Sequence, residues 1–318
     1  MNQDRQAAAA DRPRKLRDQA HVALHQARSA HATIQRTLRL RFVTVPVPIH
    51  DANIQDQCES TAPLPRARRL PVVLTAPLGG LAALRGASVC ELDGVDGSGL
   101  GVYLLEFDLE SFVSGDFAQS GVACPPNVAR SVRKRQAEFL FGRLAARLAL
   151  SSQFPAAAME EVAIGATREP VWPSDAIGSI SHCGGVAAAA VERRDPRSGI
   201  GIDIERIATG DASKALLATV VDGQEIALLR GLAGDQWSLE LLLTLVFSAK
   251  ESLFKGAFGA VGRYFDFDAA QLLSVNLGRR RIRLLLTGTL CAQFVQGQHI
   301  DIGFELLDAD LVLTHFVW

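Results

Sequence analysis

The amino-acid sequence predicts an α+β protein of two similar lobes in a pseudo-twofold arrangement, each a small, mainly antiparallel sheet packed with a long helix. Two long helical segments are expected, at about 129–150 and 236–258. Strand-like segments precede and follow each helix, and short turns such as Cys183-Gly184-Gly185 favour antiparallel pairing of neighbouring strands. The order of strands and helices therefore repeats along the chain, although the two halves share too little sequence to establish a repeat.

Composition divides the chain into three parts. Residues 1–70 are rich in Ala, Arg and Pro, and residues 1–41 hold nine Arg or Lys against three Asp. Helical propensity without a clean apolar stripe, followed by repeated prolines, predicts a basic, partly ordered extension. Residues 71–198 are predicted to form an N-terminal lobe, and residues 199–318 a C-terminal lobe with metal-binding acids.

The N-terminal lobe is expected to contain short strands around a basic helix. Residues 102–108 favour a strand, and the helix at 129–150 interleaves Arg and Lys with Phe and Leu, which is typical of an amphipathic helix. Residues 177–182 and 186–191 predict two short strands. The turn at 195–199 leads into a third, acidic strand, and we expect these three strands to form an antiparallel meander.

The C-terminal lobe is expected to begin with helices and end with strands. The helices are predicted at about 213–231 and 236–258. Alternating and continuous apolar runs predict strands at 281–286, 299–306 and 311–317.

The composition is that of an ordinary globular protein. Apolar residues make up 48% and charged residues 21%, and the net charge of -1 gives no overall attraction for nucleic acid. No apolar run reaches the roughly 18–20 residues that span a bilayer, and no apolar region marks a secretory signal. Five scattered cysteines without metal-ligand spacing favour a reduced, cytoplasmic enzyme, although the Arg-rich start shares features of an organelle transit peptide. Two covalently joined lobes make a monomer the expected state.

The predicted acidic strand provides the first part of a candidate site. Its sequence G-I-G-I-D-I-E-R alternates apolar and acidic residues, so Asp203 and Glu205 are expected on one face. A solvated strand edge would explain most such pairs. Here the surrounding Ile and Gly residues predict a buried strand, where two carboxylates need a cation or a proton.

The second long helix provides the other part of this site. Glu251 and Lys255 lie one turn apart, with Lys250 beside them. Such a pattern is usually a surface ion pair, but the flanking Leu and Phe residues predict that the charged side lines a cleft. Asp203, Glu205 and Glu251 could therefore meet around one hard divalent cation, and the lysines could hold the phosphates of a substrate bound to it.

Two further motifs are ambiguous by themselves. Ser181 and His182 end a predicted strand, where a lone histidine is more often structural than catalytic. The segment R-E-P-V-W-P, residues 168–173, predicts a rigid aromatic loop that either passes over a nucleotide or serves packing alone.

Order and spacing connect these motifs. The series of the basic helix, R-E-P-V-W-P, S-I-S-H, G-I-D-I-E and F-S-A-K-E-S-L-F-K resembles the two-lobed Sfp class of 4′-phosphopantetheinyl transferases, with particular likeness to the enterobactin-synthetase-associated branch. The resemblance covers roughly residues 100–306. It implies transfer of the phosphopantetheine arm of coenzyme A to a serine of an apo acyl or peptidyl carrier protein, with release of adenosine 3′,5′-bisphosphate and a requirement for Mg²⁺.

The resemblance also implies roles for individual residues. Asp203, Glu205 and Glu251 would bind the metal, with Glu251 also the base for the serine proton. Lys255 would contact the diphosphate near the attacking serine. The residues expected to bind coenzyme A are Lys134 or Arg135, Arg168, Ser181, His182, Lys250 and Lys255.

Two other functions remain open from the sequence alone. One is a catalytically silent regulator that binds coenzyme A, and the other is an unrelated Mg²⁺-dependent phosphotransferase. The intact acids and lysines disfavour the first, and the absence of G-x-x-x-x-G-K-[ST] and kinase motifs disfavours the second. The carrier protein and its pathway are not indicated by the sequence.

Overall fold

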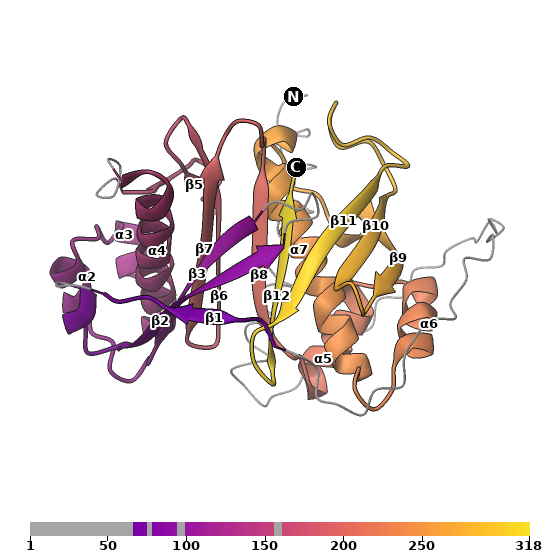
Figure 1. The fold of residues 1–318 in the computed structure, drawn as a ribbon, viewed down its shortest axis with the longest axis horizontal. Coiled ribbons are helices and arrows are strands. Elements are labelled where there is room, and N and C mark those ends of the chain that lie inside the picture. Colours follow the sequence, from indigo (N-terminus) through magenta and orange to yellow (C-terminus); the bar gives the residue numbers. More distant parts are fainter. Residues whose placement is uncertain (1–65, 75–77, 94–98, 156–160) are drawn as a thin grey trace, which may run out of the picture. The chain divides into compact units, whose positions relative to one another are not determined.

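Two antiparallel five-stranded sheets form the framework of the computed structural model, which describes residues 66–74, 78–93, 99–155 and 161–318 (Figure 1). These residues belong to one compact unit, Leu64–Trp318. Almost all of the predicted N-terminal extension lies outside the described residues. Its expected end at residue 70 falls within the first strand, so the folded part begins earlier than the composition indicates.

The first sheet packs against the basic helix α4. Its strands follow the order β1-β2-β3-β7-β6, and each neighbouring pair is antiparallel. The rings of Phe107 and Phe141 stack 4.5 Å apart where the sheet meets the helix. The bounds are Arg69–Pro71 for β1, Leu84–Asp93 for β2, Gly99–Phe107 for β3, Ala176–Cys183 for β6, Val186–Arg193 for β7 and Arg133–Gln153 for α4.

The second sheet packs against the apolar helix α7. Its order is β8-β12-β11-β10-β9, again antiparallel throughout. The side chain of Ser238 accepts a hydrogen bond from the amide of Leu241 and so caps the start of α7. The bounds are Ile200–Arg206 for β8, Leu239–Val261 for α7, Ala270–Asn276 for β9, Arg281–Leu286 for β10, His299–Leu306 for β11 and Leu311–Val317 for β12.

Shorter elements connect these two layers. The turn between β6 and β7 is a two-residue hairpin, in which Gly184 and Gly185 adopt the positive φ values of 54° and 84° that such turns require. The remaining described elements are the helices α2 (Gly115–Ser120), α3 (Pro126–Ala129), α5 (Gly210–Thr219) and α6 (Gly223–Leu232), the 3-10 turns η1 (Leu78–Gly80) and η3 (Phe267–Ala269), and the strands β4 (Ala163–Ile164) and β5 (Pro170–Val171).

The structure corrects two predictions about these elements. The single helix predicted at 213–231 is two helices, because Asp222 forms a capping box with Glu225 that starts α6. The predicted meander is also wrong. Strands β6 and β7 pair as expected, but β8 takes its backbone hydrogen bonds from β12, a strand more than a hundred residues later.

The two sheets share one apolar core. Buried side chains of β3, such as Val102 and Leu104, join a cluster with Ile202 and Ile204 of β8 and Leu313 of β12. Because alternate residues of a strand point to opposite faces, the residues between these isoleucines face α7. This packing turns Asp203 and Glu205 away from the shared core.

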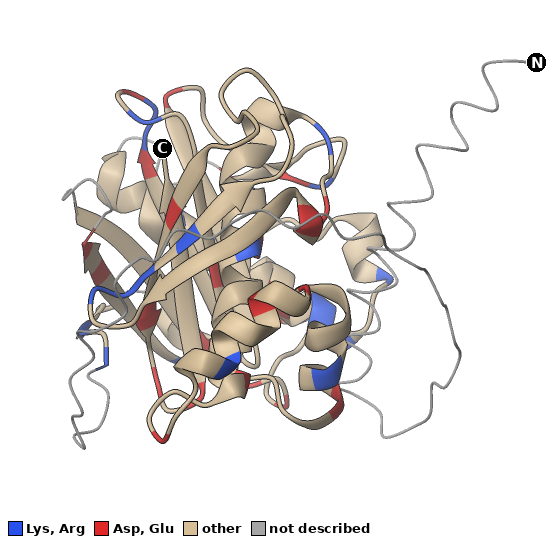
Figure 2. Ribbon diagram, turned by 90° about the vertical axis from the view of Figure 1, so that its right-hand side faces the viewer, with Lys and Arg blue, Asp and Glu red and all other residues tan. Residues whose placement is uncertain are grey.

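Charge and hydropathy add little to the description of the fold. Figure 2 shows acidic and basic residues interspersed along the described part of the ribbon. Within the described ranges, no helix is both long enough and apolar enough to cross a membrane.

Close contact between β8 and α7 depends on two glycines. A Cβ on Gly201 would lie 2.5 Å from the amide nitrogen of Gly256, which is too close for either backbone to remain in place. We therefore expect Gly201→Ala to lower the free energy of unfolding by about 1–3 kcal/mol, since overpacking displaces α7 from the strand. Denaturant unfolding followed by circular dichroism measures this loss.

The matched control for that substitution is Gly259→Ala in the same helix. Apart from its chain neighbours and the backbone of its own helix, no atom lies within 4 Å of a Cβ built on Gly259. Because alanine favours helix, this variant should be about 0.5–1 kcal/mol more stable than the parent. Equal changes in the free energy of unfolding for both substitutions would show that the packing of β8 on α7 does not exclude a Cβ at Gly201.

His315 of β12 makes stability depend on pH. The ring is 1% exposed, and burial, aided by the charge of Arg281, lowers its pKa from 6.5 to about 4. Between these values the unfolded chain binds more protons than the folded one, so stability falls as the pH falls from 6.5 to 4. At about 1.4 kcal/mol per pKa unit, the loss is on the order of 3 kcal/mol.

Urea unfolding at several pH values between 4 and 7 measures this effect. His315→Leu should flatten the slope of stability against pH, whatever its effect at neutral pH. Substitution of the exposed His299 by Gln should leave the slope unchanged. An unchanged slope in His315→Leu would exclude His315 as its source.

Candidate active site

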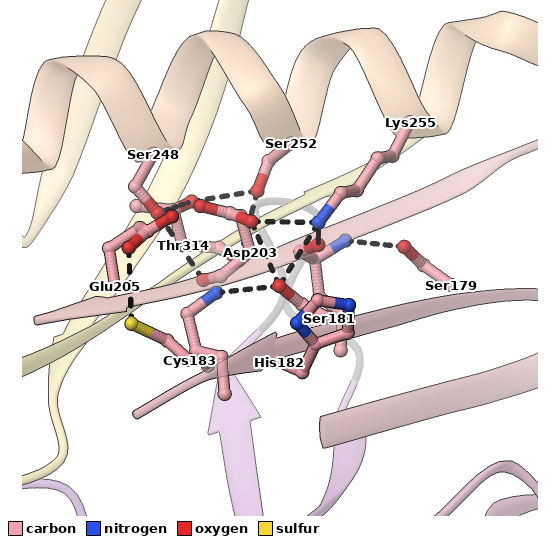
Figure 3. Close-up of polar contacts among 12 residues, drawn as sticks. Ser179, Ser181, His182, Cys183, Asp203, Glu205, Ser248, Ser252, Lys255 and Thr314 are labelled. Carbon is pink, nitrogen blue, oxygen red and sulfur yellow. Dashed lines mark hydrogen bonds and ion pairs between the residues drawn. The ribbon is translucent and has the colours of Figure 1, made fainter. Parts of the chain in front are cut away.

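Asp203 lies at the centre of a network between β8, β6 and α7. Its side chain is buried, and its Oδ1 atom accepts hydrogen bonds from Ser181 Oγ at 2.9 Å and from Lys255 Nζ at 2.7 Å (Figure 3). Lys255 also donates to Ser181 Oγ at 3.0 Å and to the Ile202 carbonyl at 3.2 Å. The structure thus brings together three of the predicted site residues.

The second oxygen of Asp203 is unusual. Atom Oδ2 is buried and has no hydrogen-bond partner among the described residues. Leaving a carboxylate oxygen buried and unsatisfied is costly. Such an atom is a suitable ligand for a cation.

Glu205 follows on the same face of β8, as the alternation of the strand predicts. Its side chain is 8% exposed, and its Oε2 atom lies 3.2 Å from the sulfur of Cys183 on β6 (Figure 3). Cys183 was not expected to contribute to the site. Its position directly after the Ser-His pair, two residues from Ser181, was the available signal.

Glu251 lies on the side of α7 that faces β8. It is buried, and it is one helical turn from Lys255, whose ammonium reaches Asp203. However, no three Asp, Glu, His or Cys side chains within the described residues are close enough together to hold a metal ion. In this arrangement, the carboxylates of Asp203, Glu205 and Glu251 are therefore not close enough together to hold the ion. Lys255 contacts one oxygen of Asp203, and Cys183 contacts one oxygen of Glu205.

Lys250 does not face this network. Its ammonium lies 2.8 Å from Glu225 Oε1 and donates to the Val220 carbonyl at 2.8 Å, and both charged side chains are 3% exposed. Burial lowers the pKa of Lys250, and the charge of Glu225 opposes this shift. The structure does not bring Lys250 together with the other residues predicted to bind coenzyme A, because its charge joins α6 to α7.

His182 lies between two charged residues of α4. Its Nε2 atom is 3.0 Å from Arg135 Nη1, and its Nδ1 atom is 3.6 Å from Glu138 Oε2. Lys134 approaches the same carboxylate at 3.9 Å. Both basic residues proposed for the helix thus lie close to the Ser-His pair, one directly and one through Glu138.

Glu138 was also missed in the sequence. It is 5% exposed and is the single acidic residue of α4. Its spacing of four residues from Lys134 was visible, but such pairs are common on helix surfaces.

Arg168 borders a pocket next to Lys255. Its φ of 73° places it in the left-handed region, which is uncommon for a residue other than glycine. The pocket has a volume of about 210 Å³, and its walls come from the β4–β5 turn, β6 and the second half of α7. The lining residues are Thr167, Arg168, Glu169, Pro170, Gly178, Ser179, Ile180, Phe254, Lys255, Phe258 and Tyr264.

Comparison with known proteins shows to which family this chain belongs. Models described as the 4′-phosphopantetheinyl transferase N-terminal domain and the 4′-phosphopantetheinyl transferase superfamily match residues 125–192 and 199–314. Enterobactin synthase component D of Salmonella typhi is 34% identical over 217 residues, which span 68% of this chain and 87% of that protein. The chain belongs to the 4′-phosphopantetheinyl transferase superfamily.

Other members of the superfamily are similarly related to it. Enterobactin synthase component D of Escherichia coli (strain K12) is 38% identical over 159 residues, covering 49% of this chain and 70% of that protein. The 4′-phosphopantetheinyl transferase Svp of Streptomyces mobaraensis is 37% identical over 185 residues, covering 56% and 69%. The two matched regions of this phosphopantetheinyl transferase homologue adjoin between β7 and β8, close to the predicted lobe boundary at 198.

Proposed function

We propose that this protein transfers the 4′-phosphopantetheine group of coenzyme A to a serine of an apo acyl or peptidyl carrier protein. In this reaction the serine oxygen bonds to the phosphorus next to pantetheine, the diphosphate bridge breaks, and adenosine 3′,5′-bisphosphate leaves. The observation that carries the proposal is the partly buried contact of Asp203, Ser181 and Lys255, in which carboxylate and ammonium meet at the junction of the two sheets. Family membership supports this class of reaction.

The β8 acids fit a hard divalent cation. Carboxylate oxygens are preferred ligands of Mg²⁺, and the unsatisfied Oδ2 of Asp203 provides one. We assign Asp203 and Glu205 as ligands, with Glu251 as the third. Bound there, Mg²⁺ would neutralise charge on the diphosphate during attack.

Lys255 and Glu251 are the residues proposed to act on the reacting atoms. The Lys255 ammonium balances the charge of Asp203, and in the complex it would donate to a diphosphate oxygen and stabilise developing negative charge. Glu251, one turn away, would accept the serine proton directly or through water. Glu251 is buried, so solvent screens its charge little, whereas the Lys255 side chain is 26% exposed and its charge is partly screened.

The remaining polar residues are proposed to bind the nucleotide end of coenzyme A. Lys134 and Arg135 gather positive charge at the start of α4, next to His182 of β6, and Arg168 adds another cation at the pocket. The pocket itself is lined by aromatic rings of α7 and its C-terminal turn. We propose that it takes the less polar pantetheine arm while Lys255 contacts the attached phosphate.

His182→Ala should raise the KM for coenzyme A about tenfold and leave kcat within about twofold. The reason is that a hydrogen bond to phosphate, present in ground and transition states alike, stabilises both equally. Steady-state kinetics against coenzyme A at saturating carrier measure the two constants. The exposed His299→Ala is the control, and a fall in kcat with unchanged KM would contradict a binding role.

Mass spectrometry of a carrier protein tests the proposed function. The enzyme is incubated with coenzyme A, Mg²⁺ and an apo carrier, and a mass gain of one phosphopantetheine on the carrier serine is expected. A carrier variant with Ala at that serine should gain no mass. If the enzyme binds coenzyme A but leaves several unrelated apo carriers unchanged, the silent regulator becomes the better explanation.

A further inference from the structure

Side chains of β6 replace a partner strand along the free edge of β8. The backbone amides of Ile202 and Ile204 donate to Ser179 Oγ at 3.0 Å and to Ser181 Oγ at 3.2 Å. The amide of Arg206 donates to the sulfur of Cys183 at 3.4 Å. The three acceptors follow the two-residue period of β6 (Figure 3). We call this row of Ser179, Ser181 and Cys183 against the β8 amides the seam, and it fixes the register between the two sheets.

The second and third members of the seam also orient the acids of β8. Ser181 donates to Asp203 at 2.9 Å while it accepts from the amide of the next residue, Ile204. Cys183 repeats this pattern, since its thiol donates to Glu205 at 3.2 Å and accepts from the next amide. Ser181 and Cys183 thus each donate to one carboxylate of β8 and accept from the backbone amide of the residue after it.

We infer that Cys183 is a positioning residue: its thiol holds one oxygen of Glu205 and so keeps this carboxylate on the face of β8 where the divalent cation is proposed to bind. This inference rests on the proposed function. Ser181 also contacts Lys255, so its replacement would disturb several groups together, whereas Cys183 contacts Glu205 and the Arg206 amide of β8. Partners of this kind typically change metal affinity by about tenfold or more when they are removed.

A purely structural role is the competing explanation for Cys183. The residue is 5% exposed and belongs to the apolar cluster shared by the two sheets. Three substitutions separate the two roles. Cys183→Ser keeps a hydrogen-bond donor and acceptor. Cys183→Val fills the space with an apolar side chain that cannot donate, and Cys183→Ala removes the donor and the side-chain volume together.

The test is direct binding of Mn²⁺ to the full chain in the presence of coenzyme A, measured from the electron paramagnetic resonance signal of free Mn²⁺. Cys183→Ala and Cys183→Val should bind Mn²⁺ about tenfold more weakly than the parent, and Cys183→Ser within about threefold. Thermal unfolding without metal is recorded for each variant. Equal Mn²⁺ affinity in the Ser and Val variants, or changes that follow only the melting temperature, would overturn the positioning role.

This experiment also separates failure of the inference from failure of the proposed function. If the parent protein binds Mn²⁺ with coenzyme A and the Val variant binds it equally well, only the role of Cys183 is lost. If the parent binds no Mn²⁺ with coenzyme A, the metal site itself is refuted and the inference is refuted with it.

Discussion

Replacing Asp203 with Asn is expected to lower kcat for carrier modification by about a thousandfold or more. The substitution keeps the shape of the side chain, and its amide oxygen can still accept from Ser181 and Lys255. It removes the negative charge that would hold the cation against the diphosphate, and loss of one preorganised electrostatic contact costs about 10²–10³ in rate. Loss of a metal ligand adds to this effect.

The measurement is the initial rate of holo-carrier formation at saturating coenzyme A and several Mg²⁺ concentrations. Asp211→Asn is the control, because Asp211 is an exposed acid in an ion pair with Lys214 on α5. Parental rates for Asp203→Asn at saturating Mg²⁺ would remove Asp203 from the metal site. Thermal unfolding should show that both variants remain folded.

Lys250→Met is expected to lower the free energy of unfolding by about 3–5 kcal/mol. The substitution leaves the Glu225 carboxylate 3% exposed without its cation, and breaking one side of a buried pair has this cost. Glu225 also accepts hydrogen bonds from the amides of Asp222 and Leu272. The start of α6 and its contact with β9 should therefore loosen together.

Denaturant unfolding measures this loss, and Lys214→Met is the matched control on an exposed pair. Its effect should be within about 0.5 kcal/mol. The double variant Lys250→Met with Glu225→Gln should lose less stability than the sum of the two single variants, because the unpaired charge is gone. A stable Lys250→Met protein with a raised KM for coenzyme A would restore Lys250 to the substrate site.

Local sequence patterns were sufficient to predict most strands of the C-terminal lobe. The strands predicted at 281–286, 299–306 and 311–317 match β10, β11 and β12, because their apolar patterns are bounded by polar turns. Strands β2 and β9 were not predicted. In β2, Gly, Ser and Asp residues interrupt the apolar pattern, so its identity depends on pairing with β3.

The errors have a common physical cause in contacts between distant parts of the chain. The meander failed because β8 was assigned to its sequence neighbour, whereas its hydrogen bonds go to β12. The pairing of Lys250 with Glu225 could not be predicted, because Glu225 lies on another helix. Cys183 and Glu138 were overlooked for the same reason, since burial beside a charged group cannot be read from a local pattern.

A crystal structure with coenzyme A and Mn²⁺, collected for anomalous scattering from manganese, tests the central claim most directly. We predict one ion bound by oxygens of Asp203, Glu205 and Glu251, with the Lys255 ammonium moved from Asp203 to the diphosphate. An ion held by other residues, or a diphosphate bound away from β8 with Lys255 still on Asp203, would contradict this account.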